Sequence, residues 1–175
     1  ADGGEDTSCT QTVFHALASA RQAGIFVPNE TIAKAVKYLE SAQDPSTGGF
    51  AYTPRGNRKT TPACTAGGAY IAQLAGQRDT EMVNAALRHL KSMAPGIITG
   101  GGSYYYYTHY YAIQAMVQAG DDEYAKWYPL IRDALITRQN EMGAWAKGKG
   151  GSSYTTPMAI IILATPHRYI PIYQR

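Results

Sequence analysis

Cysteine and charge are both scarce in this sequence of 175 residues, and each shortage excludes a class of protein. Two cysteines, Cys9 and Cys64, are too few for the dense disulfide framework of a small secreted module. Charged residues make up 17% of the chain and hydrophobic residues 45%, a balance that argues against disorder. No uncharged stretch is apolar for long enough to predict a membrane span. We therefore expect one folded, soluble domain over residues 1–175.

Net charge and the start of the chain predict little about partners or compartment. Sixteen Lys and Arg against thirteen Asp and Glu leave a formal charge of +3, which is too small a bias to predict nucleic-acid binding. No basic segment followed by an apolar run opens the chain, although residues 1–4 could follow a removed signal peptide. The compartment is therefore open, and an extracytoplasmic location is compatible with such removal.

The distribution of charge predicts the architecture. Asp, Glu, Lys and Arg are absent from four stretches, which are residues 7–20, 60–77, 92–120 and 150–167. The charged stretches between them show apolar residues at helical spacing, as in Ile32, Val36 and Leu39. We predict buried helices in the charge-free stretches, alternating with half-buried amphipathic helices. Asp79 and Asp121-Asp122 are expected to cap two of the amphipathic helices, and Pro129 is expected in the first turn of a helix that carries Ile131 and Leu135.

An internal repeat follows from the same segmentation. Leu39-x-x-x-Gln43 precedes Gly48-Gly49-Phe50, and Leu135-x-x-x-Gln139 precedes Gly143-Ala144-Trp145. The two glutamines are 96 residues apart, which equals two units of 48. We therefore expect helical hairpins at approximately residues 6–50, 51–100 and 101–148, followed by a partial unit over 149–175.

The segment 135–145 resembles the glutamine-tryptophan repeat of terpenoid cyclases and protein prenyltransferases, and residues 39–50 look like a degraded copy. The tail, 168–175, looks like the ending of little-characterised bacterial members of that superfamily. The resemblance implies an all-α fold, a toroid-like stack of hairpins whose charge-free helices form the inner ring around a cavity. Toroids of this family close with about six hairpins, so the chain is expected to form about half a ring. Missing N-terminal repeats or a partner chain would then complete it.

The sequence contains only some of the catalytic residues of the enzymes that it resembles. No Asp-x-Asp-Asp acid, no Asp-Asp-x-x-Asp magnesium motif and no Cys-Gly-Glu-Gln thioester motif occurs in the chain. Prenyltransferases bind zinc through Asp, Cys and His near the starts of inner helices. Cys64 and His109 are expected at such starts, but Pro62 stands where that pattern has its Asp. We expect no cofactor, with zinc at Cys64 and His109 as the alternative.

The most unusual segment is residues 104–111, which contains six tyrosines and His109. At the start of an inner helix these side chains would line the cavity and stack on an apolar, aromatic or acidic ligand. The candidate ligand-binding residues here are Tyr105, Tyr106, His109 and Tyr111. A Tyr/His pair can also move a proton next to a carboxylate, so the catalytic candidates are His109, Tyr107 and Tyr110.

Two basic loops precede predicted inner helices and should lie on one rim of the cavity. Arg55 and Arg58 precede one helix, and Lys147 and Lys149 precede another. Such a rim could bind an anionic group.

Two functions therefore remain open. The first is a non-catalytic binding or assembly module that uses a Tyr-rich concave face. The alternative is an enzyme on the same fold, either a lyase or hydrolase of acidic polysaccharide that uses Tyr and His, or a zinc-dependent prenyl transferase.

Overall fold

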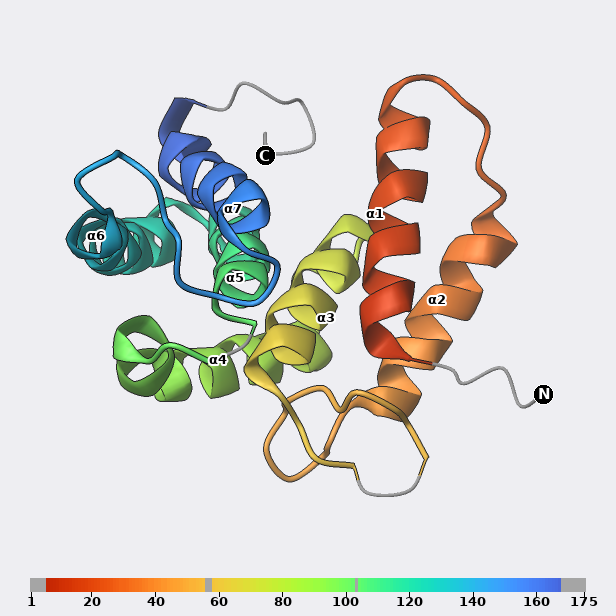
Figure 1. Cartoon of the computed structure of the whole chain (residues 1–175). Helices are drawn as coiled ribbons and strands as arrows, with labels where there is room; N and C mark the ends of the chain where they lie inside the picture. Colours follow the sequence, from red (N-terminus) through yellow and green to blue (C-terminus); the bar gives the residue numbers. More distant parts are fainter. Residues whose placement is uncertain (1–5, 56–57, 103, 168–175) are drawn as a thin grey trace.

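The computed structural model describes residues 6–55, 58–102 and 104–167. These residues form an all-α fold without a β-strand, as the charge pattern predicts, and end in a short 3-10 helix at Thr165–His167. The seven α-helices of the described residues are α1 (Thr7–Gln22), α2 (Asn29–Ala42), α3 (Pro62–Leu74), α4 (Glu81–Thr99), α5 (Tyr105–Ala119), α6 (Asp121–Arg138) and α7 (Ser152–Ala164) (Figure 1). The apolar run 159–163, which alone resembles a strand in the sequence, lies within α7.

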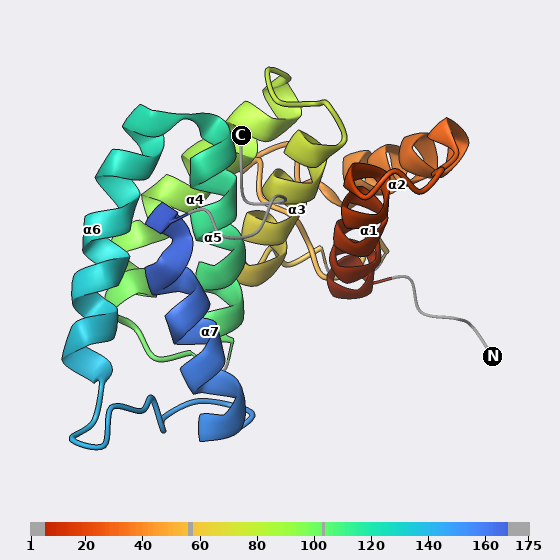
Figure 2. The ribbon, with the colours of Figure 1, turned by 90° about the horizontal axis from the view of Figure 1, so that it is seen from above.

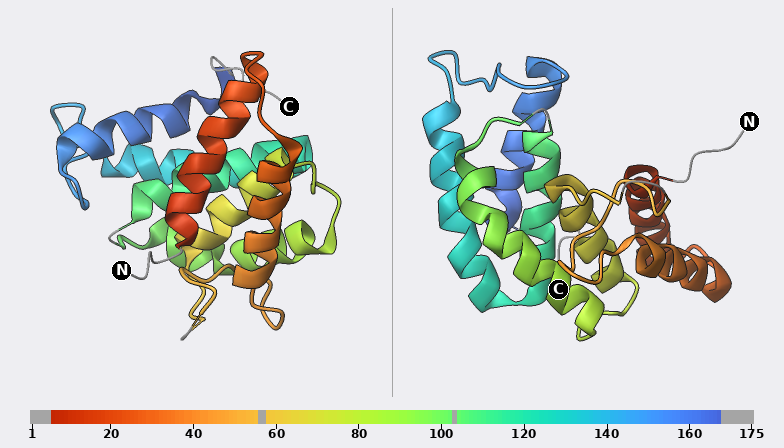
Figure 3. Two further views of the ribbon diagram at one scale, coloured as in Figure 1. Left: turned by 90° about the vertical axis from the view of Figure 1, so that its right-hand side faces the viewer. Right: turned by 90° about the horizontal axis from the view of Figure 1, so that it is seen from below.

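The helices form two layers. The odd-numbered helices pack in succession, α1 on α3, α3 on α5 and α5 on α7, and the even-numbered helices pack against their outer side. Figure 2 shows that the odd-numbered helices run in roughly the same direction, so their N-termini lie at one end of the layer. The α1–α2 hairpin lies at one edge of the molecule and the α6–α7 pair at the other (Figure 3). We call the odd-numbered helices the inner layer and the even-numbered helices the outer layer.

Two of the four charge-free helices, α3 and α5, are the most deeply buried elements. The prediction of buried helices is wrong for the other two, because α1 and α7 lie at the edges of the inner layer and bury only three residues each. Every residue from Cys64 to Gln73 in α3 is buried, and so are most residues of α5. Two glycines allow α3 to be packed this closely. A Cβ atom at Gly67 would collide with the amide of Gln11, and one at Gly68 would lie 2.6 Å from a ring carbon of Phe50. The absence of charge from residues 60–77 therefore has a direct cause, because a charged side chain in this position would be buried among neighbouring helices.

Side-chain caps set the start of three helices. Asp6, Thr61 and Thr80 each accept a hydrogen bond from the backbone N–H three residues ahead, in α1, α3 and α4. Thr80 is the cap of α4, whereas the sequence predicted Asp79. Gly24 and Gly76 follow the ends of α1 and α3 with positive φ angles of 80° and 84°, as expected for C-terminal glycines.

The start of α6 differs from the prediction. The helix begins at Asp121, with Gly120 at the N-cap, so Pro129 lies in the helix interior and not in its first turn. Asp121 and Asp122 occupy the first turn without capping it through a side chain. Their charges favour a helix N-terminus, and burial of Trp127 and other apolar side chains outweighs the backbone hydrogen bond that Pro129 removes.

The two predicted repeat turns make the same contacts. Gln43 Nε2 donates to the carbonyl of Gly48 at 2.9 Å, and Gln139 Nε2 donates to that of Gly143 at 2.8 Å. The aromatic residue that follows is buried in both copies. Trp145 also donates from Nε1 to the Leu135 carbonyl at 2.8 Å. These contacts join the end of an outer helix to the turn that follows it.

The packing of α3 predicts opposite effects of alanine at two helical glycines. Gly68→Ala gains helix propensity of about 1 kcal/mol but forces the Phe50 ring to move, so we expect the free energy of unfolding to fall by about 1–3 kcal/mol. Gly96→Ala in α4 meets no atom within 4 Å, and should raise stability by roughly 0.5–1 kcal/mol. Urea unfolding of both variants measures the difference, and equal effects of the two substitutions would contradict the close packing.

Candidate functional site

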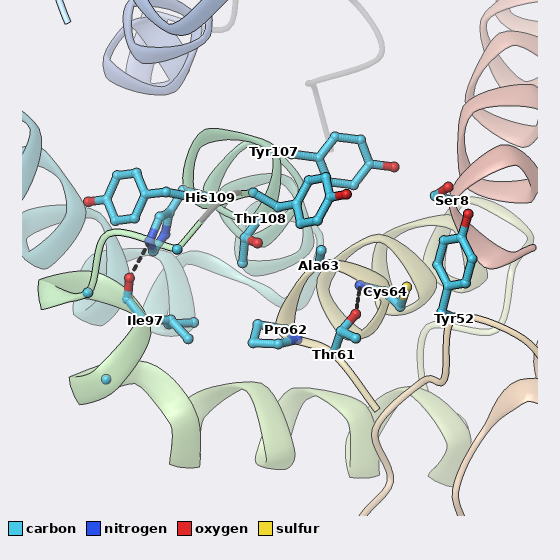
Figure 4. Close-up of a pocket in the computed structure, with 15 residues that line it drawn as sticks. Ser8, Tyr52, Thr61, Pro62, Ala63, Cys64, Ile97, Tyr107, Thr108 and His109 are labelled. Atoms are coloured by element: carbon cyan, nitrogen blue, oxygen red, sulfur yellow. Dashed lines mark hydrogen bonds between the residues drawn. The ribbon is translucent and has the colours of Figure 1, made fainter. Parts of the chain in front are cut away.

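A pocket of about 650 Å³ lies at the N-terminal ends of α1, α3 and α5, where the C-terminal end of α4 forms part of its wall. Figure 4 shows His109 and Ile97 at one end of the pocket and Ser8, Tyr52 and Cys64 at the other. Its lining comprises Ser8, Tyr52, Thr61, Pro62, Ala63, Cys64, Gly96, Ile97, Gly100, Gly102, Tyr104, Tyr105, Tyr107, Thr108 and His109. None of these side chains is an acid, a lysine or an arginine.

The last carbonyl groups of α4 are held by side chains of α5 and α6. His109 Nε2 lies 3.0 Å from the Ile97 carbonyl, and Tyr105 donates its hydroxyl to the Ile98 carbonyl at 3.2 Å. Arg138 donates to the carbonyls of Thr99 and Gly100 at 2.8 and 2.6 Å. Helix ends leave such carbonyl groups without partners inside the helix, so these three side chains cap α4. They thereby fix the wall of the pocket that α4 provides.

His109 is fully buried and neutral. Burial lowers its pKa to about 4, and the nearby Arg138 charge acts in the same direction, while the hydrogen bond to the Ile97 carbonyl opposes them. Because a carbonyl only accepts, the hydrogen of the neutral ring is on Nε2. Nδ1 is then an acceptor, and it has no hydrogen-bond partner in the described part of the chain. The ring also packs against Tyr105, with centroids 4.4 Å apart.

Tyr107 connects α5 to α1. Its hydroxyl donates to Gln11 Oε1 at 3.0 Å, and Gln11 Nε2 donates to the Cys64 carbonyl at 2.9 Å. Burial raises the pKa of Tyr107, and the adjacent Tyr111 raises it further. The phenol is therefore protonated at neutral pH and is a poor base. Tyr105 is similar, because burial raises its pKa to about 12 against the opposing charge of Arg138.

Asp6 lies next to the other end of the pocket. It accepts hydrogen bonds from Ser8 Oγ at 2.6 Å and from Tyr52 Oη at 3.2 Å, in addition to its bond from the Cys9 amide. Partial burial alone would raise the pKa of Asp6, but these hydrogen bonds lower it to about 2. The carboxylate is thus fully used in capping α1 and fixing Tyr52.

A second, smaller pocket of about 240 Å³ adjoins the first between the starts of α5 and α7. Tyr104 and Tyr107 line both pockets, and Tyr106, Tyr154 and Gly150 complete the second together with Lys149. The ammonium of Lys149 lies 5.0 Å from the centre of the Tyr104 ring and 3.3 Å from its hydroxyl. Among the residues that the structure describes, Lys149 is the only charged one in the lining of either pocket.

The predicted tyrosine cluster is divided among several faces of α5. Tyr105 and Tyr107 line the large pocket and Tyr106 the small one. Tyr110 and Tyr111 line neither, and their rings pack against each other and against His15. The segment therefore provides both pocket lining and ordinary core packing.

The predicted basic rim does not gather at the large pocket. Arg55 and Arg58 are exposed in the loop before α3, and Arg58 Nε donates to the Pro54 carbonyl at 3.0 Å. Lys147 is exposed in the loop before α7. Neither pocket is lined by any of these three residues, so only Lys149 of the four predicted side chains reaches one.

The described residues contain no group of three or more His, Cys, Asp or Glu side chains placed to bind a metal ion. Cys64 and His109 both line the large pocket, but Thr108 and Ala63 lie between them (Figure 4). The thiol of Cys64 is buried, and this burial raises its pKa. Cys9 is exposed, and both cysteines are free thiols. The zinc site considered from the sequence thus gains no third ligand from the described residues.

Two contributors to the site were not predicted from the sequence. Arg138 is not among the candidate residues that the sequence predicts, yet its guanidinium lies 4.2 Å from the centre of the Tyr105 ring. Basic residues in the last turn of a helix often bind the carbonyl groups of that helix, whereas Arg138 ends α6 and binds those of α4, so the sequence carries no direct signal for this contact. Gln11, in a charge-free stretch that predicts a buried helix, does offer a signal, since a buried amide needs hydrogen-bond partners.

Comparison with known proteins identifies no relative, since no protein-family model matches the chain and neither any curated protein nor any solved structure is significantly similar to it. The resemblance to terpenoid cyclases and prenyltransferases therefore stays a prediction. Among the helices of the described residues, none combines the length and apolarity needed to cross a membrane.

The burial of His109 predicts an acid-sensitive contribution to stability. The folded side chain titrates near pH 4, whereas a histidine in the unfolded chain titrates near 6.5. Between these values the unfolded state binds more protons, so the free energy of unfolding falls as the pH drops from 6.5 towards 4. His109→Gln keeps a donor for the Ile97 carbonyl but does not titrate.

Between pH 7.5 and 4.5 we expect the free energy of unfolding to fall by about 2 kcal/mol more in the wild type than in His109→Gln, because each unit of pKa difference corresponds to about 1.4 kcal/mol. Urea unfolding at both pH values measures the difference. Asp6 titrates at lower pH, and His15 is common to both proteins, so neither contributes to it. Parallel pH profiles would show that His109 is solvated.

Proposed function

We propose that this protein is a non-catalytic helical-repeat module that binds a neutral, largely apolar small molecule in the pocket at the N-terminal ends of α1, α3 and α5. The observation that carries the proposal is a pocket of about 650 Å³ in whose lining the described part of the chain places no acid, lysine or arginine. Pockets of this size and character hold drug-sized molecules. An ionised ligand would lose its hydration there without gaining an opposite charge.

The few polar groups of the pocket favour orientation of the ligand over chemistry on it. Ser8, Tyr52 and Thr108 present hydroxyl groups in the lining. The starts of α1 and α3 already have side-chain caps in Asp6 and Thr61, so a ligand anion would compete with hydrogen bonds that are already made. A ligand with one or two neutral polar groups on an apolar body fits this lining best.

The enzymatic alternatives receive less support from the described residues. A lyase acting on uronates needs a cation near the carboxylate and a base of suitable pKa. The large pocket has no lysine or arginine in its lining, and the pKa of Tyr107 is raised rather than lowered. A zinc-dependent transferase would need a third ligand beside Cys64 and His109.

We further propose that the two layers are part of an α/α toroid that other repeats or a partner chain complete, as the resemblance implies. Support comes from the succession of inner helices and from the repeated turns at Gln43 and Gln139. In that arrangement the N-terminal ends of the inner helices would open together on one side of the ring.

A pair of fluorescent probes tests the binding proposal. N-phenylnaphthylamine is neutral and apolar, and anilinonaphthalene sulfonate adds a negative charge to a similar body. We expect saturable one-to-one binding of the neutral probe, and at least tenfold weaker binding of the sulfonate. Fluorescence titration measures both. Preference for the sulfonate would contradict an uncharged site.

Two substitutions locate the probe. Ala63→Phe fills the pocket from α3, and Gly102→Trp fills it from the loop before α5, where a Cβ atom meets nothing within 4 Å. Both should weaken binding of the neutral probe at least tenfold. Ala33→Phe, at an exposed position of α2, is the matched control and should leave binding unchanged. Equal binding by all three variants would place the probe elsewhere.

A further inference from the structure

The two glutamine turns make corresponding hydrogen bonds, although the glutamine and the glycine are five residues apart in the first turn and four apart in the second. The turns differ in what lies outside them. Gly48 and Gly143 both adopt positive φ angles, 79° and 76°, and in each turn the glutamine amide donates to the glycine carbonyl. A buried aromatic residue, Phe50 or Trp145, follows each turn. In both copies its backbone N–H donates to a threonine hydroxyl at 3.1 Å. The turns are therefore two copies of one structural motif.

The first copy is occupied by the next outer helix. Gln43 Nε2 makes a second hydrogen bond, to the Met82 carbonyl in the first turn of α4, at 2.8 Å. Ala85 of α4 packs directly on the turn, and a Cβ atom at Gly48 would lie 2.6 Å from the Ala85 methyl group. His89, one turn further along α4, covers Gly49. The turn thus binds α4 through one side-chain amide hydrogen bond. Its two glycines have no side chains, so the helix packs directly on the backbone of the turn.

The second copy has these features, but none of the described helices packs on it. The described residues offer Gln139 Nε2 no acceptor besides the Gly143 carbonyl. A Cβ atom at Gly143 would meet nothing closer than Gln139 Nε2 itself, at 3.8 Å. Two exposed apolar side chains belong to this copy, Met142 in the turn by 92% and Ile136 in the last turn of α6 by 57%. At the first copy the corresponding positions carry the polar residues Thr47 and Glu40.

We propose that this face, formed by the Gly143 turn with Ile136 and Met142, docks an amphipathic helix of a partner chain in the way that the Gly48 turn docks α4. The interface continues the outer layer, because the docked helix would follow α6 as α4 follows α2. It would place a backbone carbonyl of its first turn on Gln139 and a small side chain on Gly143. The proposal is independent of the small-molecule pocket, which lies at α1, α3 and α5.

The sequence of the second turn also predicts which side chains the docked helix carries where it contacts the turn. Ala144 replaces Gly49, so a methyl group occupies the space that the His89 ring takes at the first copy. The docked helix therefore needs small residues at two positions four apart, where α4 has Ala85 and His89. Met142 and Ile136 add apolar contacts that the first copy lacks, so flanking apolar residues on the helix would add affinity.

A peptide derived from α4 tests the proposal with the intact protein, whose own α4 already fills the first copy. The probe is residues 80–99 with His89→Ala, labelled with a fluorophore and held helical by a lactam between positions 84 and 88, which are exposed in α4. Fluorescence anisotropy should show saturable one-to-one binding. The same peptide carrying Ala85→Trp should bind at least tenfold more weakly, because the indole cannot approach Gly143.

Protein variants identify the face. Met142→Arg should weaken peptide binding at least tenfold. Phe26→Arg is the matched control, since Phe26 is 85% exposed at the opposite edge, in the α1–α2 loop, and it should leave binding unchanged. Failure of the peptide to saturate at millimolar concentration, or equal binding by the Ala85→Trp peptide or the Met142→Arg protein, would overturn the proposal. Concentration-dependent self-association that Met142→Arg abolishes would also overturn it, by naming a second copy as the occupant.

Discussion

The close approach of α3 to its neighbours is the constraint on which the rest of the structure depends. Gly67 and Gly68 bring α3 against Gln11 and Phe50, so that α3 contacts α1 and α5 in its own layer and α4 outside it. A helix enclosed in this way cannot carry charge, and its polar backbone ends must be capped from nearby. The absence of charge from residues 60–77 and the Thr61 cap of α3 are consequences of this one packing requirement.

The same requirement explains why the most reactive-looking side chains perform structural work. His109, Tyr105 and Arg138 bind the terminal carbonyls of α4, and Tyr107 is tied to Gln11. Their polar atoms face helix ends or buried amides, which would otherwise lack partners at a cost of about 1–3 kcal/mol each. What remains for a ligand is an apolar hollow with a few hydroxyl groups. The pocket's binding properties therefore depend on this apolar lining more than on the tyrosine hydroxyl groups of residues 104–111.

The sequence predicted the helices well because burial and charge are recorded residue by residue. Each of the seven described helices overlaps a charged or an uncharged stretch, although α4 extends to Thr99, inside the charge-free stretch 92–120, and α6 begins at Asp121. Gln43 and Gln139 lie at the two predicted turns. The helix start predicted from Pro129 is wrong, because a proline is tolerated inside a helix when the burial of residues such as Trp127 and Ile131 outweighs its cost. That burial is a property of the tertiary structure. The site was less predictable for a geometric reason. Residues 104–111 form little more than two turns of a helix, so their side chains point to the pocket, to α7 and to α1 in turn, and only the packing decides which is which.

The stepwise packing of the inner layer also has a consequence for how the molecule opens. Each hairpin is stabilised mainly by the hairpins beside it, as in other stacked repeats, so the protein should lose its structure from the edges inward. The α1–α2 edge is the weaker one, because among the residues of α2 only Leu39 and Ala42 are buried. Backbone amides of α2 would then exchange with solvent deuterium well before those of α3 and α5, and the pocket would lose its α1 side while the α3–α5 core persists.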